Sequence, residues 1–339
     1  MKIAIHSRAE TFSDRWIDYC EENNIEYKLV NCYDTDIIQQ LSDCDGLMWH
    51  WGHNDYKAVL FARQLTYSLE FAGKKVFPDS KTAWHYDDKV GQKYLLESIG
   101  APLVSSYVFY DREQARQWAR ETSYPKVFKL RVGAGSANVQ LVKNRYRAFR
   151  LINRAFGKGF PILDRKSIML DRLHRYHKKK DCKNFKELLK GLYRLIIPKH
   201  YERMRANEKG YVYFQEFIPE NDFDIRVFVI GNRSFALKRM VRKNDFRASG
   251  SGSFLFNKEE IPLECVRTAF IWAKKIEAQS IAFDFLYDRG NILFVEISYS
   301  FPWHETYHYP GYWDDGLNWH EEEVFPERFM IEDFVRQLQ

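Results

Sequence analysis

The sequence contains few cysteines and no long hydrophobic run. Its five cysteines are scattered along 339 residues without a CxxC pair. This argues against a disulfide framework or a zinc site and fits a reducing compartment. No apolar run approaches the roughly 18–20 residues that cross a bilayer. The first residues, Lys2–His6, are typical of a strand and not of a signal peptide. We therefore expect a soluble, cytoplasmic protein.

The charge is unevenly distributed along the chain. The net charge of +6 is mild and by itself identifies no partner. Residues 143–209, however, contain 21 Lys and Arg against 6 Asp and Glu, a net charge of +15, which leaves 31 against 40, or −9, elsewhere. This segment predicts either a basic helical insertion that contacts an anionic polymer or membrane surface, or a solvated helix packed on its own domain. Its apolar residues at helical spacing are Phe185, Leu188, Leu189, Leu192 and Leu195.

Aromatic residues are not regularly interleaved with the basic residues of this segment. Stacking of aromatic side chains on bases is a usual part of single-strand recognition. We therefore expect no nucleic-acid partner.

The first 82 residues alternate short strand-like and helix-like segments. Such alternation predicts a parallel sheet covered by helices. The expected strands are 2–6, 27–30, 46–51 and 75–77, and the expected helices are 12–23, 35–41 and 56–72. Open α/β sheets bind ligands at the carboxyl ends of their strands. The candidate substrate contacts at the end of the third strand are therefore His50, Trp51, His53 and Asn54.

A glycine-rich segment follows an expected strand at Pro125–Leu130. Gly133, Gly135 and Ser136 belong to a run of small residues whose backbone N–H groups can cradle phosphate oxygens. Lys129, at the end of the strand, can supply a matching cation. The alternative is a glycine-rich hairpin turn. Before this region, Asp87 or Asp88 can cap a helix that Gly100 and Pro102 end.

Two carboxylates stand in neighbouring apolar strands of the segment Ser280–Ser300. If the connecting loop has three residues, Asp284 lies directly opposite Glu296 on one face; a two-residue loop places them on opposite faces. Facing carboxylates repel one another unless a cation lies between them, which favours an oxygen-lined Mg²⁺ site. The alternative is a hairpin with two solvent-facing acids.

Three further strands are expected over residues 211–217, 224–230 and 233–240. Asp224 and Arg226 share one strand face, and the loop 245–252 carries Arg247. One antiparallel sheet can thus present Asp224, Arg226, Arg239 or Lys238, Asp284 and Glu296. Several cations beside several acids suit a Mg-nucleotide site. A network of salt bridges is the alternative.

As an ordered set, these motifs resemble the ATP-grasp superfamily. The resemblance covers roughly residues 86–300. It is nearest to the branch of the ribosomal-protein glutamate ligase and glutathione synthetase and to ATP-grasp proteins of polysaccharide biosynthesis. It implies an α/β chain with an N-terminal parallel-sheet domain, 1–82, followed by two α+β lobes that clamp ATP. The lobes are expected at 83–217, with the basic insertion at 143–209, and at 218–339.

The resemblance also implies roles for individual residues. Lys89 and Lys129 would contact phosphate, and Gln215–Ile218 would form the adenine hinge, with Glu216 and Phe217 lining the base. Asp224 would lie near the ribose. The other implied roles are catalytic for Arg226, Arg239 and Arg247, and metal-binding for Asp284, Glu296 and Ser298. Ser298 stands where related enzymes commonly have Asn.

The implied activity is ATP- and Mg²⁺-dependent ligation of a carboxylate to an amine through an acyl phosphate. The loop 248–253 can close over that intermediate. The aromatic tail, with Trp303, His304, Trp313 and Trp319, suits binding of a sugar-like carboxylate substrate. The alternative is a tail that only packs against its own domain. The alternatives are an ATP-grasp phosphotransferase and a catalytically silent nucleotide-binding module that engages an anionic surface.

Overall fold

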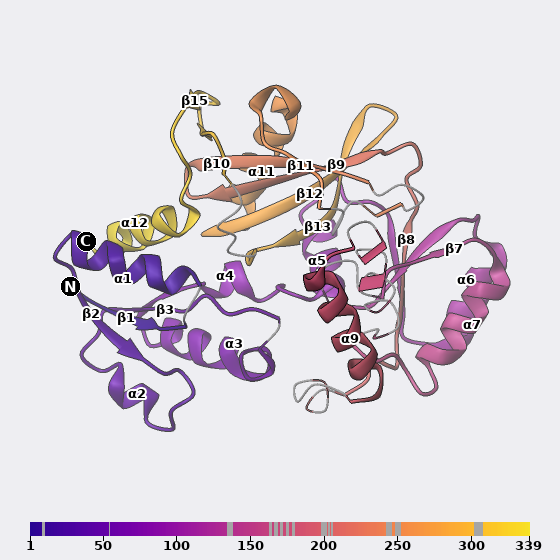
Figure 1. Ribbon diagram of the computed structural model, residues 1–339, viewed down its shortest axis with the longest axis horizontal. Coiled ribbons are helices and arrows are strands. Elements are labelled where there is room, and N and C mark those ends of the chain that lie inside the picture. Colours follow the sequence, from indigo (N-terminus) through magenta and orange to yellow (C-terminus); the bar gives the residue numbers. More distant parts are fainter. Residues whose placement is uncertain are drawn as a thin grey trace. The chain divides into compact units, whose positions relative to one another are not determined.

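Figure 1 shows the computed structural model of the chain. The structure describes residues 1–8, 11–53, 55–133, 138–162, 165, 169, 172–173, 176–177, 180–197, 202, 204, 206–241, 246–247, 252–301 and 308–339. They form two compact units: unit 1 contains 1–86, 94–102 and 220–339, and unit 2 contains 87–93 and 103–219. The division into three domains stays a prediction. Within the described residues, no helix is both long and apolar enough to cross a membrane.

Unit 1 begins with the predicted parallel sheet. Its strands are β1 (Lys2–His6), β2 (Glu26–Val30), β3 (Gly46–Met48) and β4 (Lys75–Phe77), in the order β2-β1-β3-β4 with every pair parallel. The helices between them are α1 (Phe12–Glu22), α2 (Ile37–Gln40) and α3 (Tyr56–Phe71), and α4 (Ser80–Ala83) follows β4. Thr11 and Asp55 cap α1 and α3 by accepting hydrogen bonds from backbone N–H groups of their first turns. The third strand ends three residues earlier than expected.

The second part of unit 1 is an antiparallel sheet in the order β13-β12-β9-β10-β14-β15, with β11 paired to β10. The helix α11 (Leu263–Ile276) packs against it (Figure 1). The strands are β9 (Phe223–Ile230), β10 (Arg233–Met240), β11 (Phe254–Leu255), β12 (Ser280–Asp288), β13 (Asn291–Ser298), β14 (Tyr312–Asp314) and β15 (Trp319–His320).

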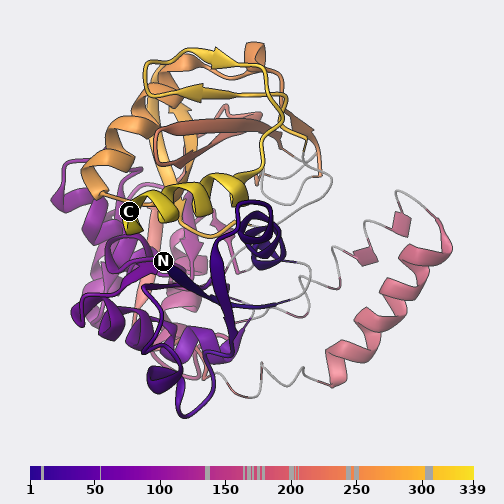
Figure 2. The same cartoon turned by 90° about the vertical axis from the view of Figure 1, so that its left-hand side faces the viewer.

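The C-terminal helix α12 (Pro326–Leu338) joins the two parts of unit 1. It lies beside α1 (Figure 2), where the indole N–H of Trp16 donates to the backbone oxygen of Glu327 at 3.0 Å. Phe334 of α12 belongs to one buried cluster with Phe77 of β4 and Phe228 of β9. The N-terminal sheet and the antiparallel sheet therefore share a hydrophobic core.

The loop between β12 and β13 has two residues, not three. Arg289 and Gly290 both have positive φ, 51° and 84°, as the tight hairpin turn of this length requires. Asp284 nevertheless lies opposite Glu296, because Val295 is an extra residue that shifts the register between Asp284 and Phe285. A β-bulge thus restores the facing pair that the short loop alone would separate.

Unit 2 is built on an antiparallel sheet in the order β5-β8-β6-β7, from β5 (Ser106–Phe109), β6 (Lys126–Lys129), β7 (Gln140–Val142) and β8 (Val212–Glu216). The helices α6 (Arg112–Glu121) and α7 (Arg145–Ala155) bury Ala119 and Leu151 against Phe128 and Phe214 of one face. β8 thus pairs in a different sheet from β9 and β10, although the three follow one another in sequence.

Two further helices complete the description. The helix α5 (Lys89–Ser98) is capped by Asp88, whose Oδ1 accepts from the N–H groups of Val90 and Gly91. Gly100 follows α5 with a φ of +74°, as the sequence predicts for a helix end. The helix α9 (Cys182–Ile196) lies in the basic segment and confirms the helical spacing of its apolar residues.

Candidate functional site

Charged side chains from four neighbouring strands share one face of the antiparallel sheet. Asp284 of β12 lies directly opposite both Arg226 of β9 and Glu296 of β13, and Asp224 of β9 lies opposite Arg239 of β10. Residues directly opposite one another in an antiparallel sheet point to the same face. The structure therefore brings these five predicted site residues together; below they are called the charged face.

Two arginines hold Asp284 on the charged face. Arg226 donates from Nε to Oδ1 at 2.6 Å and from Nη2 to Oδ2 at 2.7 Å. Arg239 makes the same two-bond contact with Asp224, at 2.5 and 2.7 Å, and its Nη2 lies 3.0 Å from Oδ2 of Asp284. Such bidentate contacts fix the orientation of the guanidinium plane as well as its position.

Burial and charge act in opposite directions on these acids. Asp284 is 7% exposed, and burial opposes its ionisation, but Arg226 and Arg239 outweigh burial and hold its pKa below the usual range. For Asp224 burial is the stronger influence, so its pKa is raised despite Arg239. Burial also opposes the charge of Arg239, yet Asp284 and Asp224 together raise its pKa. The charged face thus favours an ionised Asp284.

The charged face fits a magnesium ion by its donor types. A carboxylate has about four lone-pair positions that can accept a hydrogen bond or bind a metal. On Asp284, Arg226 and Arg239 together occupy three of these positions, so one position on Oδ1 is left. Glu296 faces Asp284, and the hydroxyl of Ser298, two residues further on, donates to the backbone oxygen of Ser300 at 2.6 Å. Among the described residues, no group of three or more His, Cys, Asp or Glu is arranged for a metal. Mg²⁺ commonly takes only one or two carboxylates, with water and phosphate oxygens.

Lys238 lies on the opposite face of β10 from Arg239. Its Nζ is 2.8 Å from Oε2 of Glu260 and 4.3 Å from the ring centre of Phe223. The sequence left Arg239 and Lys238 as candidates from β10. The strand register decides between them, because Arg239 points to Asp284 and Lys238 points to the other face.

In unit 2, two predicted phosphate-binding lysines contact polar groups. Lys89 donates to the backbone oxygen of Gly133 at 2.7 Å, and the N–H of Gly133, whose φ is +107°, donates to Oδ1 of Asp87 at 2.7 Å. The buried Lys129 donates to Oε1 of Gln215 at 2.6 Å. Gly135 and Ser136 lie outside the described residues.

The structure does not place the carboxylate of Glu216 with Lys129 and Gln215. Successive side chains of β8 point to opposite faces, and Glu216 accepts from Lys126 at 2.6 and 2.8 Å and from Tyr107 at 2.9 Å. Phe217 and Ile218 follow the end of β8 and are half-buried.

The remaining predicted residues are placed as follows. Arg247 is half-buried, while most of the loop 248–253 lies outside the described residues, as do Trp303, His304 and Asn54. Trp313 is buried and packs edge-to-face on Trp319, with ring centres 4.6 Å apart, and Trp319 is half-buried. Just after the end of β3, Trp51 is buried and His50 is half-buried against Phe12.

Residues around Lys89 form a network that the sequence did not predict. Arg131 lies 2.9 Å from Asp88 through Nη1, and its backbone N–H donates to the hydroxyl of Tyr211 at 2.7 Å. The Tyr211 hydroxyl in turn donates to Glu208 at 2.7 Å. Arg131 comes two residues after Lys129, and Asp88 directly precedes Lys89. These positions next to the two lysines are the only signal in the sequence that points to Arg131 and Asp88.

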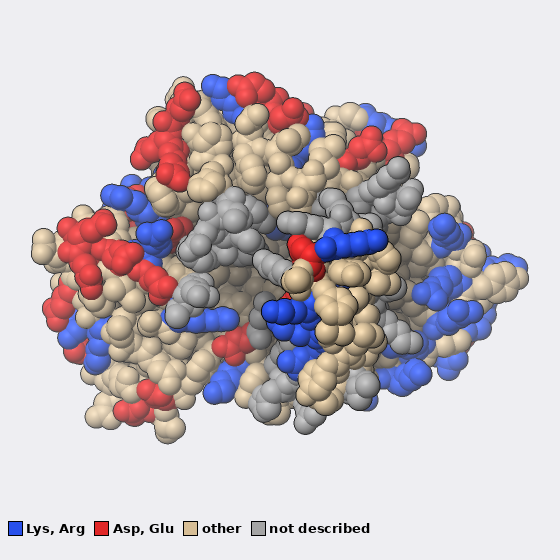
Figure 3. Space-filling model, in the orientation of Figure 1, with Lys and Arg blue, Asp and Glu red and all other residues tan. Residues whose placement is uncertain are grey.

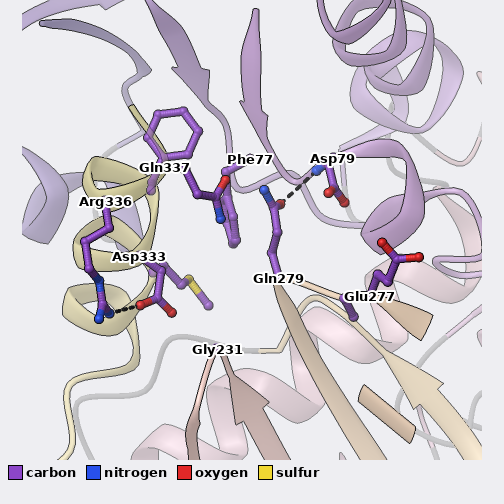
Figure 4. Close-up of a pocket in the computed structure, with 11 residues that line it drawn as sticks. Phe77, Asp79, Gly231, Glu277, Gln279, Asp333, Arg336 and Gln337 are labelled. Atoms are coloured by element: carbon purple, nitrogen blue, oxygen red, sulfur yellow. Dashed lines mark hydrogen bonds and ion pairs between the residues drawn. The ribbon is translucent and has the colours of Figure 1, made fainter. Parts of the chain in front are cut away.

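A separate cavity of about 370 Å³ lies in unit 1 between β4, the β9–β10 turn, the start of β12 and α12 (Figure 4). Gly231, on its rim, is five residues from Arg226 along β9, or about 16 Å at the usual strand rise. Gln279 bridges its wall by accepting from the N–H of Asp79 and donating to the backbone oxygen of Val76. This cavity is therefore distinct from the charged face.

The order and geometry of these elements define an ATP-grasp fold. Residues 193–308, which include β8–β13 and the charged face, match the family model of the RimK-like ATP-grasp domain. The match and the solved structures described next confirm the predicted resemblance to the ATP-grasp superfamily and the predicted fold class. No curated protein matches the chain.

Three solved structures illustrate the similarity. The RimK domain ATP-grasp protein from Sphaerobacter thermophilus is 15% identical with a TM-score of 0.52, over 88% of this chain and 90% of that one. The D-alanine–D-alanine ligase from Bacillus anthracis in complex with ATP is 12% identical with a TM-score of 0.53, over 88% and 86%. The ATP-grasp ligase PsnB in complex with a minimal precursor is 14% identical with a TM-score of 0.55, over 100% and 99%. At these identities the similarity concerns the fold.

Proposed function

We propose that the protein is an ATP- and Mg²⁺-dependent ligase that joins a carboxylate to an amine. The observation that carries the proposal is the charged face, where Arg226 and Arg239 lie beside the facing acids Asp284 and Glu296. This face falls within the segment that matches the RimK-like ATP-grasp domain. Solved structures of similar fold include a D-alanine–D-alanine ligase in complex with ATP and the ligase PsnB in complex with a minimal precursor, Mg and ADP.

In the proposed reaction, a substrate carboxylate oxygen attacks the γ-phosphorus of ATP, the bond to the bridging oxygen of ADP breaks, and an acyl phosphate forms. The amine nitrogen then attacks the acyl carbon, phosphate leaves, and the amine loses a proton. Arg226 and Arg239 stabilise the negative charge that develops on the phosphoryl oxygens, and we assign the same role to Arg247. Asp284, Glu296 and Ser298 would hold Mg²⁺, which neutralises phosphate charge when it is bound.

For the nucleotide, we propose contacts from unit 2. Lys89, Lys129 and the backbone around Gly133, Gly135 and Ser136 would bind phosphate. Gln215, Phe217 and Ile218 would form the adenine contact, and Glu216 would contribute through its backbone, since its carboxylate is held by Lys126. Asp224 would lie near the ribose, although its present contact with Arg239 also makes it a support for that arginine.

For the carboxylate substrate, we propose a carboxyl-bearing sugar or polysaccharide precursor. What supports this is the aromatic composition of residues 301–320 and the half-buried position of Trp319. The buried Trp313 would support Trp319 and not contact the substrate itself. A cytoplasmic location, which all five free cysteines fit, is part of the same proposal.

The test is a screen of acid–amine pairs with ATP and Mg²⁺, scored by phosphate release and by mass spectrometry of the products. A ligase releases ADP and phosphate only when both an acid and an amine are present, and its product is an amide. A phosphorylated product formed without an amine would show a phosphotransferase instead. Asp284→Asn and Glu296→Gln should each abolish turnover while the circular dichroism spectrum stays that of a folded protein. Full activity in both variants contradicts the metal assignment.

A further inference from the structure

The helix α9 exposes an apolar face on the surface of unit 2. Phe185, Leu189, Leu192 and Tyr193 follow one another at helical spacing, and 45%, 48%, 48% and 56% of their surfaces are exposed. At 100° per residue they lie within an arc of about 100°. Large apolar side chains on one face of a helix are ordinarily buried, so this exposure needs an explanation.

Phe185 of the apolar face lies against Tyr176 of its own segment, with ring centres 5.8 Å apart. The other described contacts of α9 with this segment come from the opposite side of the helix. A Cβ at Gly191 would lie 2.7 Å from Sδ of Met169 and 3.0 Å from Cδ of Arg172. Arg172 also donates from Nη1 to the backbone oxygen of Glu187 at 2.7 Å. Gly191 is 200° around the helix from Leu189. These contacts leave Leu189, Leu192 and Tyr193 outward, so most of the apolar face does not pack on the described part of its own domain.

Positive charge borders the apolar face. Lys186 and Lys190 are exposed and lie next to Tyr193 around the helix, and residues 182–196 contain four Lys and Arg against one Glu. In Figure 3, a strip of uncharged side chains over α9 lies beside Lys and Arg side chains. Residues 143–209 as a whole carry a net charge of +15, so the excess of positive charge is not confined to α9.

We propose that α9 docks on an anionic lipid bilayer, with its apolar face in the boundary between headgroups and acyl chains. A helix that combines Phe, Leu and Tyr on one face with Lys and Arg on the other has the composition of an interfacial membrane helix. Anionic headgroups complement the lysines that flank this face. A second copy of the chain fits the same surface less well, because pairing two α9 helices would bring their lysine-rich edges together. This inference does not depend on the proposed ligase activity.

Co-sedimentation of the full chain with lipid vesicles tests the proposal. We expect binding to vesicles that contain phosphatidylglycerol, weak binding to phosphatidylcholine alone, and a steep fall in binding as salt is raised. Leu189→Glu with Leu192→Glu should lower the partition coefficient at least about tenfold. Lys186→Gln and Lys190→Gln should each lower it about fivefold. The matched control is Leu60→Glu with Phe71→Glu in α3, where 58% and 96% of the side-chain surfaces are exposed; it should bind as the wild type does.

A second readout uses the cysteines. Cys182, the first residue of α9, is exposed, whereas the other four cysteines are buried. An environment-sensitive fluorophore attached to Cys182 should shift to the blue when phosphatidylglycerol vesicles are added. The absence of any shift, or equal binding by the Leu189→Glu/Leu192→Glu variant, overturns the proposal. The proposal is also overturned if analytical ultracentrifugation shows a dimer of the wild type that is absent in this variant. Such a dimer would show that the apolar face binds a second copy of the chain.

Discussion

Nη2 of Arg239 lies 3.0 Å from Oδ2 of Asp284, while the same guanidinium makes two hydrogen bonds to Asp224. Arg239 of β10 therefore links two acids of the charged face, the half-buried Asp224 of β9 and the buried Asp284 of β12. Asp224 is in this sense a positioning residue for Arg239. Removing the Asp224 carboxylate should leave the buried guanidinium of Arg239 with only part of its counter-charge.

We accordingly expect Asp224→Asn to lower the free energy of unfolding by about 3 kcal/mol, because breaking a buried ion pair leaves its partner uncompensated. Urea denaturation measures this loss. The matched control is Lys238→Gln, on the other face of the neighbouring strand, whose partner Glu260 has a 42% exposed side chain. That change should cost less than about 1 kcal/mol. Equal losses in the two variants would contradict the role given to Asp224.

A second prediction concerns magnesium. With ADP at about 100 times its Kd, Mg²⁺ should raise the melting temperature of the wild type by about 5 °C over ADP alone. Glu296→Gln removes one of the two facing carboxylates and should lose most of this increment, while ADP alone still stabilises the variant. Differential scanning fluorimetry with and without EDTA checks this. Glu260→Gln, which changes an acid on the other face, should keep the increment.

His50 predicts acid sensitivity. Its ring packs on Phe12, with centres 4.3 Å apart, its buried Nε2 has no hydrogen-bond partner among the described residues, and burial lowers its pKa to about 3. A histidine with a lowered pKa takes up its proton more readily in the unfolded chain, so stability is full above about pH 6.5 and is lost as the pH falls below it.

Between pH 7.5 and 5.5, this difference amounts to about 1.4 kcal/mol. His50→Phe should remove that part of the pH dependence, as measured by urea denaturation at both values. An unchanged pH dependence in His50→Phe would show that the ring is not held neutral.

A fourth prediction separates backbone conformation from packing. Gly231 has a φ of +58°, and a Cβ there would collide with Oδ2 of Asp333, which Arg233 holds in place through Oδ1. Gly290 has a φ of +84°, and apart from its chain neighbours no atom of the described residues lies within 4 Å of such a Cβ. We expect Gly290→Ala to cost about 1 kcal/mol of unfolding free energy and Gly231→Ala about 2–4 kcal/mol. Thermal unfolding compares them, and equal costs would contradict the close contact with Asp333.

Much of the fold follows from local patterns in the sequence. The alternation of strands and helices over the first 82 residues predicts β1 to β4 within a few residues, since side-chain period and capping residues are local signals. The same reasoning predicts the helical spacing of the apolar residues in α9. It does not predict that the tail ends in α12 or that α12 packs on α1, because that contact spans more than 300 residues.

The sequence by itself determined the kinds of residue on the charged face: Asp224 and Arg226 two apart in one strand, and one acid in each strand of a hairpin. Only the tertiary structure decided that β9 lies between β10 and β12, that Arg239 and not Lys238 points to Asp284, and that the bulge at Val295 compensates for the two-residue turn. The physical reason is that side-chain alternation depends on the backbone of a single strand. Strand order and register instead depend on hydrogen bonds and side-chain packing between segments far apart in the chain.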